Sequence, residues 1–334
     1  MTSTLPVTPI DLQLRRNQPP MLRVEPPADP ADWVLAHRDP LRAAVSTHGS
    51  VLVRGLGLRS PVQVAAVLER LSAAPVTERE AFAPRQTFAE GVYSSSKWPQ
   101  NEQMCMHHEL SYALDVPGLL FFACLTAPTD GGATAVADSA AVLQALPPEL
   151  VDRFEREGWV LTRSYNDEIG ASVADAFGTD DRGEVEDYCR THAIEPAWQS
   201  DGSLHTRQRR DAVLRHPADG RRCWFNQIAF LNEWTINPDV RDYLVAEYGV
   251  DGLPFNTRWG DGEPLAQDTV RQINQVYQAH TARTRWHAGD LLLVDNIRTA
   301  HSRERFTGPR EVVVAMADPL RLAECSPTME VNVR

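Results

Sequence analysis

The feature that most constrains the fold is a set of potential metal ligands split between two distant segments of the chain. His107 and Glu109 form a His-x-Glu pair, and a lone histidine, His301, lies far downstream. Two histidines and one carboxylate can occupy one face of an octahedral metal ion and leave the other positions open. A fold that uses these residues together must bring the middle of the chain against its C-terminal part.

The spacing of the first pair distinguishes two adjacent histidines. Side chains alternate along a strand, so residues two apart point to the same side. His107 and Glu109 would therefore face a metal together, whereas His108 would point away. The alternative is a surface pair, because so short a motif often occurs by chance. A lone histidine such as His301 is likewise more often a core or surface residue than a ligand.

An arginine downstream of His301 adds a second constraint. Leu291–Asp295 is predicted to be a strand, the gap before His301 contains a turn, and Arg310 opens the next strand. A guanidinium can bind a carboxylate through two parallel hydrogen bonds, which a lysine cannot reproduce. Without His301 at this interval, a salt bridge at a strand edge would be the default explanation for Arg310.

The predicted elements are mainly β, with helices around them. Strands are expected near the potential ligands and helices elsewhere, which suits a double-stranded β-helix, or jelly roll, wrapped by helices. It does not suit a regular alternation of strands and helices. The predicted helices lie near Asp32–His37, from Asp39 to the residue before Gly49, from Pro61, and over Ser139–Leu146, Pro148–Glu157 and Ala266–Ala282. The predicted strands are Val51–Gly55, Leu119–Thr126, Ala133–Ala137, Trp159–Tyr165, Cys223–Phe230, Leu291–Asp295 and Glu311–Ala317.

The composition changes along the chain in two places. Residues 1–30 are rich in proline and polar residues and are expected to run over the surface. Residues 31–334 are expected to form a single domain. Within it, the polar stretch of about 166–222 is predicted to be an irregular insertion with short helices. Long loops commonly cover active sites, so we expect this insertion to act as a lid.

Composition excludes several classes of protein. The net charge of −12 argues against a nucleic-acid partner, which would require a basic surface. No apolar run approaches the length of a membrane span, and no secretory signal is evident at the N-terminus. The five cysteines are widely spaced and include no C-x-x-C pair, which predicts reduced thiols in the cytoplasm. We therefore expect a cytoplasmic protein with no nucleic-acid or membrane partner.

Several motifs together resemble one known family. They are Pro84-Arg85, Val92-Tyr93-Ser94-Ser95-Ser96, Met106-His107-His108-Glu109-Leu110-Ser111-Tyr112, Gly131-Gly132-Ala133-Thr134, Asp138-Ser139, Trp224-Phe225-Asn226-Gln227 and the segment from His301 to Arg310. In these motifs, from about Phe82 to Ala317, the chain resembles the taurine dioxygenase and clavaminate synthase-like superfamily. It is most similar to the natural-product branch, which includes amino-acid hydroxylases.

The resemblance implies a complete set of site residues. His107, Glu109 and His301 would bind iron(II), and Arg310 with the hydroxyl of Thr134 would bind the distal carboxylate of the cosubstrate 2-oxoglutarate. O2 is the other cosubstrate. Many relatives carry Asp in place of Glu109, and a glutamate-bearing branch also exists. Halogenating relatives have a small residue there, so Glu109 argues against halogenation. Thr134 considered alone would be a turn residue.

The reaction implied is hydroxylation of an unactivated C–H bond in a small molecule. The substrate would be an amino acid, an amino-acid derivative or a peptide, either free or bound to a carrier protein. Arg85, Tyr93, Ser95 and Asn226 lie in segments that line the substrate pocket of this family. Arg85 could pair with a substrate carboxylate, and Asn226 is expected on a strand that faces the pocket. A surface or packing role is the alternative for each of the four.

Other interpretations stay open at this point. The same chemistry could desaturate or cyclise the substrate, or the enzyme could be a catabolic dioxygenase of sulfonates or aryloxyacids. Outside the family, two histidines and a carboxylate also serve zinc in hydrolases. An inactive jelly-roll module that binds a ligand is a further alternative. Arg310 and Thr134 argue against a hydrolase, which has no use for a 2-oxoglutarate clamp.

Overall fold

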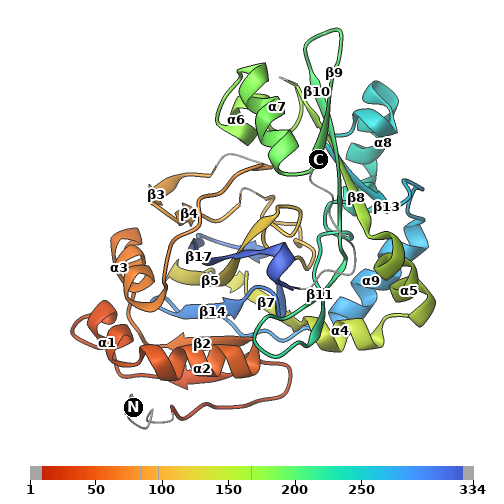
Figure 1. Cartoon of the computed structure of the whole chain (residues 1–334). Coiled ribbons are helices and arrows are strands. Elements are labelled where there is room, and N and C mark those ends of the chain that lie inside the picture. Colours follow the sequence, from red (N-terminus) through yellow and green to blue (C-terminus); the bar gives the residue numbers. More distant parts are fainter. Residues whose placement is uncertain (1–9, 83–84, 97, 167, 326–334) are drawn as a thin grey trace, which may run out of the picture.

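The centre of the molecule is a seven-stranded sheet that takes its strands from both ends of the chain (Figure 1). The computed structural model describes residues 10–82, 85–96, 98–166 and 168–325. Neighbouring strands of this sheet are antiparallel except for the first two, which are parallel. In spatial order the strands are β1 (Met21–Arg23), β2 (Ser50–Arg54), β14 (Leu291–Asp295), β5 (Asp115–Thr126), β17 (Glu311–Arg321), β4 (Val92–Ser94) and β3 (Thr87–Ala89).

Three helices cover the outer face of this sheet (Figure 1). Because side chains alternate along a strand, Leu119 and Phe121 of β5 pack in the cluster that includes the helices, whereas Leu120 and Phe122 enter the inner core. The covering helices are α1 (Pro30–Ala36), α2 (Arg38–His48) and α3 (Pro61–Leu71).

The ends of these helices follow from local sequence. The hydroxyl of Ser60 accepts a hydrogen bond from the backbone N–H of Gln63 and so caps the first turn of α3. Gly49 ends α2 in the left-handed region, with φ of 77°, where a side chain would be strained. Both boundaries were predicted from the sequence and are confirmed.

The inner face of the sheet packs against a second layer of short antiparallel strands. In this layer Ala135, Ala137 and Ala300 share one buried cluster with Leu120 and Phe122 of the main sheet. Two antiparallel layers around a common core form a jelly roll, so the predicted fold class is confirmed. The layer pairs β7 (Thr134–Asp138) with β15 (Thr299–Arg303) and β6 (Asp130–Gly131) with β16 (Phe306–Thr307).

The remaining elements surround the second layer and extend the molecule at one end (Figure 1). They include a four-stranded sheet with the order β13-β8-β10-β9 and a hairpin of β11 with β12. Their bounds are α4 (Ser139–Ala145), α5 (Pro148–Glu157), β8 (Trp159–Tyr165), α6 (Val173–Phe177), α7 (Arg182–Thr191), β9 (Ile194–Trp198), β10 (Leu204–Arg210), β11 (Val213–Arg215), β12 (Arg222–Trp224), α8 (Pro238–Tyr248), β13 (Phe255–Trp259) and α9 (Gln267–Ala279), with 3-10 turns at Glu233–Thr235, Val250–Gly252 and Leu322–Cys325.

The segment 166–222 is more regular than its composition suggested. It carries the predicted short helices, but also β9 and β10, and β10 pairs along its whole length with β8. Residues of β10 alternate between buried and more exposed positions. An antiparallel strand with one solvated face contains many polar residues. The polar composition of β9 and β10 was therefore mistaken for irregular structure, and the predicted irregular insertion was wrong for these two strands.

The N-terminal segment also departs from expectation. Met21 and Leu22 are buried, and β1 pairs in parallel with β2 at the edge of the main sheet. Met21 and Leu22 are therefore part of the core, so the whole segment does not run over the surface. Three residues are too few to show a strand period, which is why the sequence pattern missed them. Residues 1–9 and 326–334 lie outside the described part of the chain.

One strand prediction near the site needs correction. The strand predicted over Cys223–Phe230 ends at Trp224, and Asn226 accepts a hydrogen bond from the backbone N–H of Ile228 in the turn that follows. The strand predicted over Ala133–Ala137 is confirmed as β7. It follows Gly131 and Gly132, whose φ values of 66° and 69° turn the chain into the second layer, where β7 pairs with β15.

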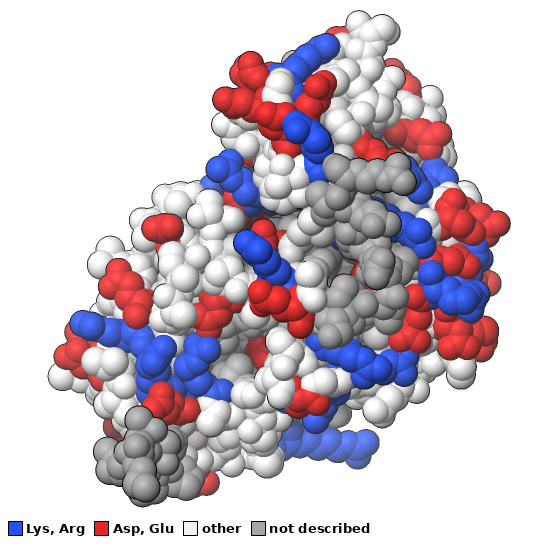
Figure 2. Space-filling model, viewed as in Figure 1, with Lys and Arg blue, Asp and Glu red and all other residues white. Residues whose placement is uncertain are grey.

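Charged side chains are distributed over the surface of this acidic chain. Figure 2 shows acidic and basic side chains interspersed on the visible face. Within the described ranges, no helix combines the length and apolar character needed to cross a lipid bilayer.

Candidate functional site

Three potential metal ligands from distant parts of the chain meet in the inner core. The ligating atoms of His107, Glu109 and His301 all lie within 4.8 Å of one another, and all three residues are buried. His301 Nε2 is 3.4 Å from Glu109 Oε2, and the two imidazole rings have their centroids 4.3 Å apart. The arrangement matches the set expected from the sequence.

Backbone hydrogen bonds hold the two histidines side by side. His301 lies in the middle of β15, and an isolated β-bridge joins it to His107. The N–H of each residue donates to the carbonyl oxygen of the other, at 3.0 Å and 2.9 Å. Glu109, however, lies in a turn that leads to Leu110, whose φ is 54°. The strand alternation assumed in the sequence prediction therefore does not hold at Glu109, although His107 and Glu109 do lie together with His301.

His108 has a structural role on the opposite side. Its Nδ1 donates to the carbonyl oxygen of Asn296 at 2.5 Å, and its Nε2 lies 3.0 Å from the hydroxyl of Ser139. The ring is fully buried. Both ring nitrogens of His108 thus contact other protein groups and are not directed at the proposed metal site. This agrees with the sequence prediction that His108 points away from the metal.

Asn296 lies in the turn between β14 and β15. Its side chain is hydrogen-bonded to the turn that carries Glu109. Asn296 Oδ1 accepts from the N–H of Glu109 at 2.9 Å, and Asn296 Nδ2 donates to the carbonyl oxygens of Glu109 and Pro117, each at 2.9 Å. The role of Asn296 was not predicted from the sequence. The only local signal was its place directly after a buried strand.

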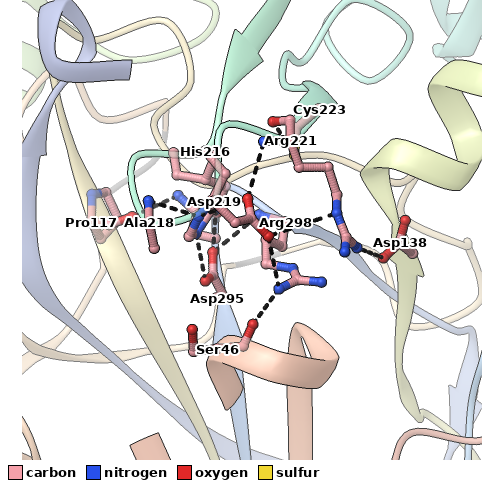
Figure 3. Close-up of polar contacts among 12 residues, drawn as sticks. Ser46, Pro117, Asp138, His216, Ala218, Asp219, Arg221, Cys223, Asp295 and Arg298 are labelled. Atoms are coloured by element: carbon pink, nitrogen blue, oxygen red, sulfur yellow. Dashed lines mark hydrogen bonds and ion pairs between the residues drawn. The ribbon is translucent and has the colours of Figure 1, made fainter. Parts of the chain in front are cut away.

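The outer side of the same turn is held by a polar network (Figure 3). Asp295 Oδ1 accepts from the N–H groups of residues 297 and 298, and Asp295 Oδ2 accepts from His216 Nε2 at 2.9 Å. Arg298 binds the carbonyl oxygen of Ser46 and lies 3.6 Å from Asp219. The network connects the turn that contains Asn296 to α2 and to the β11–β12 hairpin.

Burial and charge set the protonation of His107 and Glu109. Burial, together with the neighbouring His301, lowers the pKa of His107 to about 3, so its imidazole is neutral. Burial opposes ionisation of Glu109, but the Arg85 guanidinium and His301 outweigh it and hold the pKa of that carboxyl well below its usual range. Neutral imidazoles and an ionised carboxylate are the protonation states that a divalent metal ion requires of its ligands. The donor set therefore fits iron(II).

A cavity extends from these residues. Arg310 and Thr134, the expected 2-oxoglutarate contacts, line it together with His107, Glu109 and His301. Its remaining lining residues are Arg85, Ser95, Ser96, Met104, Phe122, Ser302, Arg303, Val312 and Val314. The potential metal ligands and the potential cosubstrate contacts thus share one enclosed space.

Arg310 is a partly buried cation that makes no ion pair within the described part of the chain. Its Nε donates to the carbonyl oxygen of Gly132 at 2.9 Å, and its guanidinium lies beside the ring of Phe306. Burial and the nearby Arg303 lower the pKa of Arg310 to about 10. A buried charge is costly unless it is paired. An anion in the cavity would supply that partner.

The structure separates the four expected substrate contacts. Arg85 and Ser95 line the cavity, whereas Tyr93 and Asn226 are not among its lining residues. The Tyr93 hydroxyl accepts from the N–H of Glu78 and donates to a backbone carbonyl. Asn226 Nδ2 donates to the carbonyl oxygen of Ala212. The polar atoms of Tyr93 and Asn226 therefore serve the protein's own backbone.

The segment 166–222 does not contribute to the lining of this cavity in the described part of the chain. It contacts the loop that leads to Arg85 instead: the N–H of Glu80 donates to the carbonyl oxygen of Ala176, and Arg79 Nη1 donates to that of Phe177. A lid role for the segment stays a prediction.

Phe230, an aromatic residue beside the ligands, was not predicted from the sequence. The ring of Phe230 stacks on the imidazole of His107, with centroids 4.4 Å apart and an interplanar angle of 17°. Trp98 also packs against Phe230, with centroids 5.6 Å apart. Phe230 lies at the end of the apolar run that was taken for a strand. Phe230 contacts His107 because the chain forms a turn over residues 228–230 where a strand was predicted.

Comparison with known proteins agrees with this geometry. Residues 15–316 match the model of the family described as taurine catabolism dioxygenase TauD, TfdA family. The dapdiamide synthesis protein DdaC of Enterobacter agglomerans is 33% identical over 281 residues, which cover 84% of this chain and 85% of that protein. A clavaminate synthase-like protein of Arabidopsis thaliana is 26% identical over 278 residues, or 80% of this chain and 81% of that protein.

Solved structures show the same fold. The crystal structure of AAD-2 in complex with Mn(II) and N-oxalylglycine superposes with a TM-score of 0.55, at 15% sequence identity. The match covers 96% of this chain and 100% of that one.

Proposed function

The chain belongs to the taurine catabolism dioxygenase TauD, TfdA family, and we propose that it hydroxylates an unactivated C–H bond of an amino acid, an amino-acid derivative or a peptide in natural-product biosynthesis. It is a dioxygenase that depends on iron(II) and 2-oxoglutarate and consumes O2. The match to the dapdiamide synthesis protein supports the biosynthetic assignment. The substrate is a small molecule, and both a free and a carrier-bound form are compatible with the site.

The observation that carries the proposal is the shared cavity. His107, Glu109 and His301 would hold the iron, and Arg310 with Thr134 would bind the distal carboxylate of 2-oxoglutarate at another part of the same wall. When bound, the iron activates O2 at the expense of oxidative decarboxylation of 2-oxoglutarate to succinate, and so supplies the chemistry that the protein itself lacks.

The protein's own residues orient the reactants and keep water out. Arg310 can present two parallel N–H donors to a carboxylate, which fixes the cosubstrate's direction as well as its position. Phe122, Val312 and Val314 supply an apolar wall to the cavity, and Phe230 covers the face of His107. Excluding water strengthens the electrostatic contacts inside the site and suppresses side reactions.

The cavity also supports this function over the alternatives outside the family. A zinc hydrolase would need the three ligands and a water, but would have no use for the unpaired charge of Arg310 in the cavity. An inactive binding module would need neither the neutral imidazole of His107 nor the ionised Glu109. We further propose a cytoplasmic location, because all five cysteines are free thiols.

The experiment that tests the function needs no knowledge of the substrate. Metal-free protein is titrated anaerobically with iron(II) and then with 2-oxoglutarate, and the visible metal-to-ligand charge-transfer band is recorded. We expect the band in the wild type and its loss in His301→Ala. Metal binding without the band would refute the cosubstrate assignment and favour the hydrolase. Succinate release in a screen of amino acids and peptides then identifies the substrate.

A further inference from the structure

Arg85 lies between two buried carboxylates, one of which belongs to the proposed metal site. Its Nη2 donates to Glu109 Oε1 at 2.9 Å, and its Nε lies 3.4 Å from Glu78 Oε1. The side chains of Arg85, Glu78 and Glu109 are 10%, 9% and 8% exposed. Charge-assisted contacts in such surroundings are strong and direct the groups that make them. The Arg85 guanidinium therefore already contacts two carboxylates, those of Glu109 and Glu78, before any substrate enters.

The two oxygens of Glu109 have different neighbours. Oε1 is bound by Arg85, whereas Oε2 lies 3.4 Å from His301 Nε2. A metal held by both residues would be reached from the Oε2 side. Because Oε1 is occupied, the carboxylate is directed to offer one oxygen and not two, which keeps the positions opposite the three ligands open for cosubstrate and O2.

We propose that Arg85 is a positioning residue that orients Glu109 for ligation through Oε2, and that Glu78 orients Arg85 in turn. The proposal rests on the proposed function, since it concerns the same metal site. It also reassigns Arg85 from the expected contact with a substrate carboxylate. Substitution of a group that orients a metal ligand typically weakens metal binding about 10- to 100-fold.

The backbone around Glu78 is fixed on both sides. The N–H of Glu78 donates to the hydroxyl of Tyr93 in β4 at 3.1 Å, and that hydroxyl lies 3.4 Å from the carbonyl oxygen of Val76. Two residues further on, the N–H of Glu80 donates to the carbonyl oxygen of Ala176 in α6. Tyr93 and Arg85, both expected at the substrate, thus support the metal ligand together.

The test measures metal binding without cosubstrate or substrate. Mn(II) binding to metal-free protein is followed by the loss of the free-ion electron paramagnetic resonance signal. Arg85→Gln is expected to weaken Mn(II) binding about 10- to 100-fold. Arg85→Lys keeps the charge but loses the fork that spans two carboxylates, so it should recover part of the affinity. Glu78→Gln should weaken binding in the same direction by a smaller factor.

Arg79→Gln is the matched control. Arg79 lies in the same segment, but its guanidinium binds the carbonyl oxygen of Phe177 and does not contact Glu109. This variant should bind Mn(II) as the wild type does, even if its thermal midpoint falls. The metal-free thermal midpoint of every variant is measured alongside. If Arg85→Gln does not fold, Arg85→Lys and Glu78→Gln decide the question.

One result would overturn the proposal while leaving the proposed function in place. It is Mn(II) binding that is unchanged or tighter in a folded Arg85→Gln variant, or in the two substitute variants if that one does not fold. If the same variant then shows a raised KM for the substrate found in the screen, Arg85 is a substrate contact. A wild type that binds metal but forms no charge-transfer band with 2-oxoglutarate would instead refute the proposed function.

Discussion

Asn296 and Glu109 are joined by a reciprocal pair of hydrogen bonds: the amide oxygen of Asn296 accepts from the Glu109 N–H, and its amide nitrogen donates to the Glu109 carbonyl oxygen, both at 2.9 Å. The pair links the turn after β14 to the turn that carries the carboxylate. His301 follows on β15, a few residues after Asn296. One side chain therefore sets the spacing of two proposed ligands.

Removing this side chain should damage stability and metal binding together. Asn296→Ala leaves the N–H and carbonyl of Glu109 and the carbonyl of Pro117 without their partner. Each unpaired buried group costs about 1–3 kcal/mol, so we expect the free energy of unfolding to fall by roughly 3 kcal/mol and Mn(II) binding to weaken. Urea denaturation and Mn(II) titration measure the two effects.

Asn166→Ala serves as the control for Asn296→Ala. Asn166 also accepts from two backbone N–H groups, but both belong to a local turn just after β8. This variant should lose about 1 kcal/mol or less and bind metal normally. If the free energy of unfolding fell equally in the two variants, Asn296 would not have the predicted special role in holding the turn of Glu109.

The adjacent histidines should separate ligation from structure. His107→Ala and His301→Ala are expected to abolish metal binding and leave the fold largely intact, because each removes one donor from the proposed set. His108→Ala should retain metal binding but lose about 1–3 kcal/mol of stability, since it leaves the Asn296 carbonyl unpaired. Titration with Mn(II) and thermal unfolding distinguish the cases. Iron-dependent succinate production by His107→Ala would refute the ligand assignment.

Arg310→Ala should raise the 2-oxoglutarate requirement far more than it weakens metal binding. The arginine lines the cavity with Thr134, and it donates a hydrogen bond to the carbonyl oxygen of Gly132, not to a proposed metal ligand. Arg310→Lys keeps a positive charge without the two-donor geometry, so its 2-oxoglutarate affinity should fall between those of the wild type and Arg310→Ala. Titrations of the charge-transfer band give both affinities. Equal losses of metal and cosubstrate binding would mean that Arg310 is structural.

Gly132 should be required for the position of Arg310. A Cβ there would lie 2.8 Å from Pro128 Cγ, 2.9 Å from Phe306 Cβ and 3.2 Å from Arg310 Cδ, on a backbone with φ of 69°. We expect Gly132→Ala to lose about 2–4 kcal/mol of stability through strain and overpacking, and to bind 2-oxoglutarate more weakly.

Gly220→Ala isolates the backbone part of that effect. Gly220 has the same φ of 69°, but a Cβ would meet nothing within 4 Å. It should lose only about 1–2 kcal/mol, the cost of a left-handed backbone for a residue with a side chain, and its 2-oxoglutarate affinity should not change. Equal effects of the two substitutions would exclude crowding around Arg310.

Local sequence determined most of the helices and several of the central strands of this protein, whereas α8 and short strands such as β3 and β13 were not predicted. The cap at Ser60, the glycine at Gly49 and the apolar run of β5 act through neighbours in the chain, and each was predicted close to its observed place. The spacing of His107, Glu109 and His301 was recognisable for a related reason: ligand chemistry restricts residue type and interval even where the fold is unknown.

Tertiary structure alone decided which polar residues support the site. Arg85 and Tyr93 were expected to meet a substrate, yet they contact Glu109 and the backbone of Glu78. Asn296 gave no signal of its role, because its partners lie in a different segment of the chain. Hydrogen bonds between distant segments depend on which strands become neighbours, and that order, with β14 between β2 and β5, is set by burial across the whole core. A local pattern contains the donors and acceptors, but only the packed fold determines how they pair.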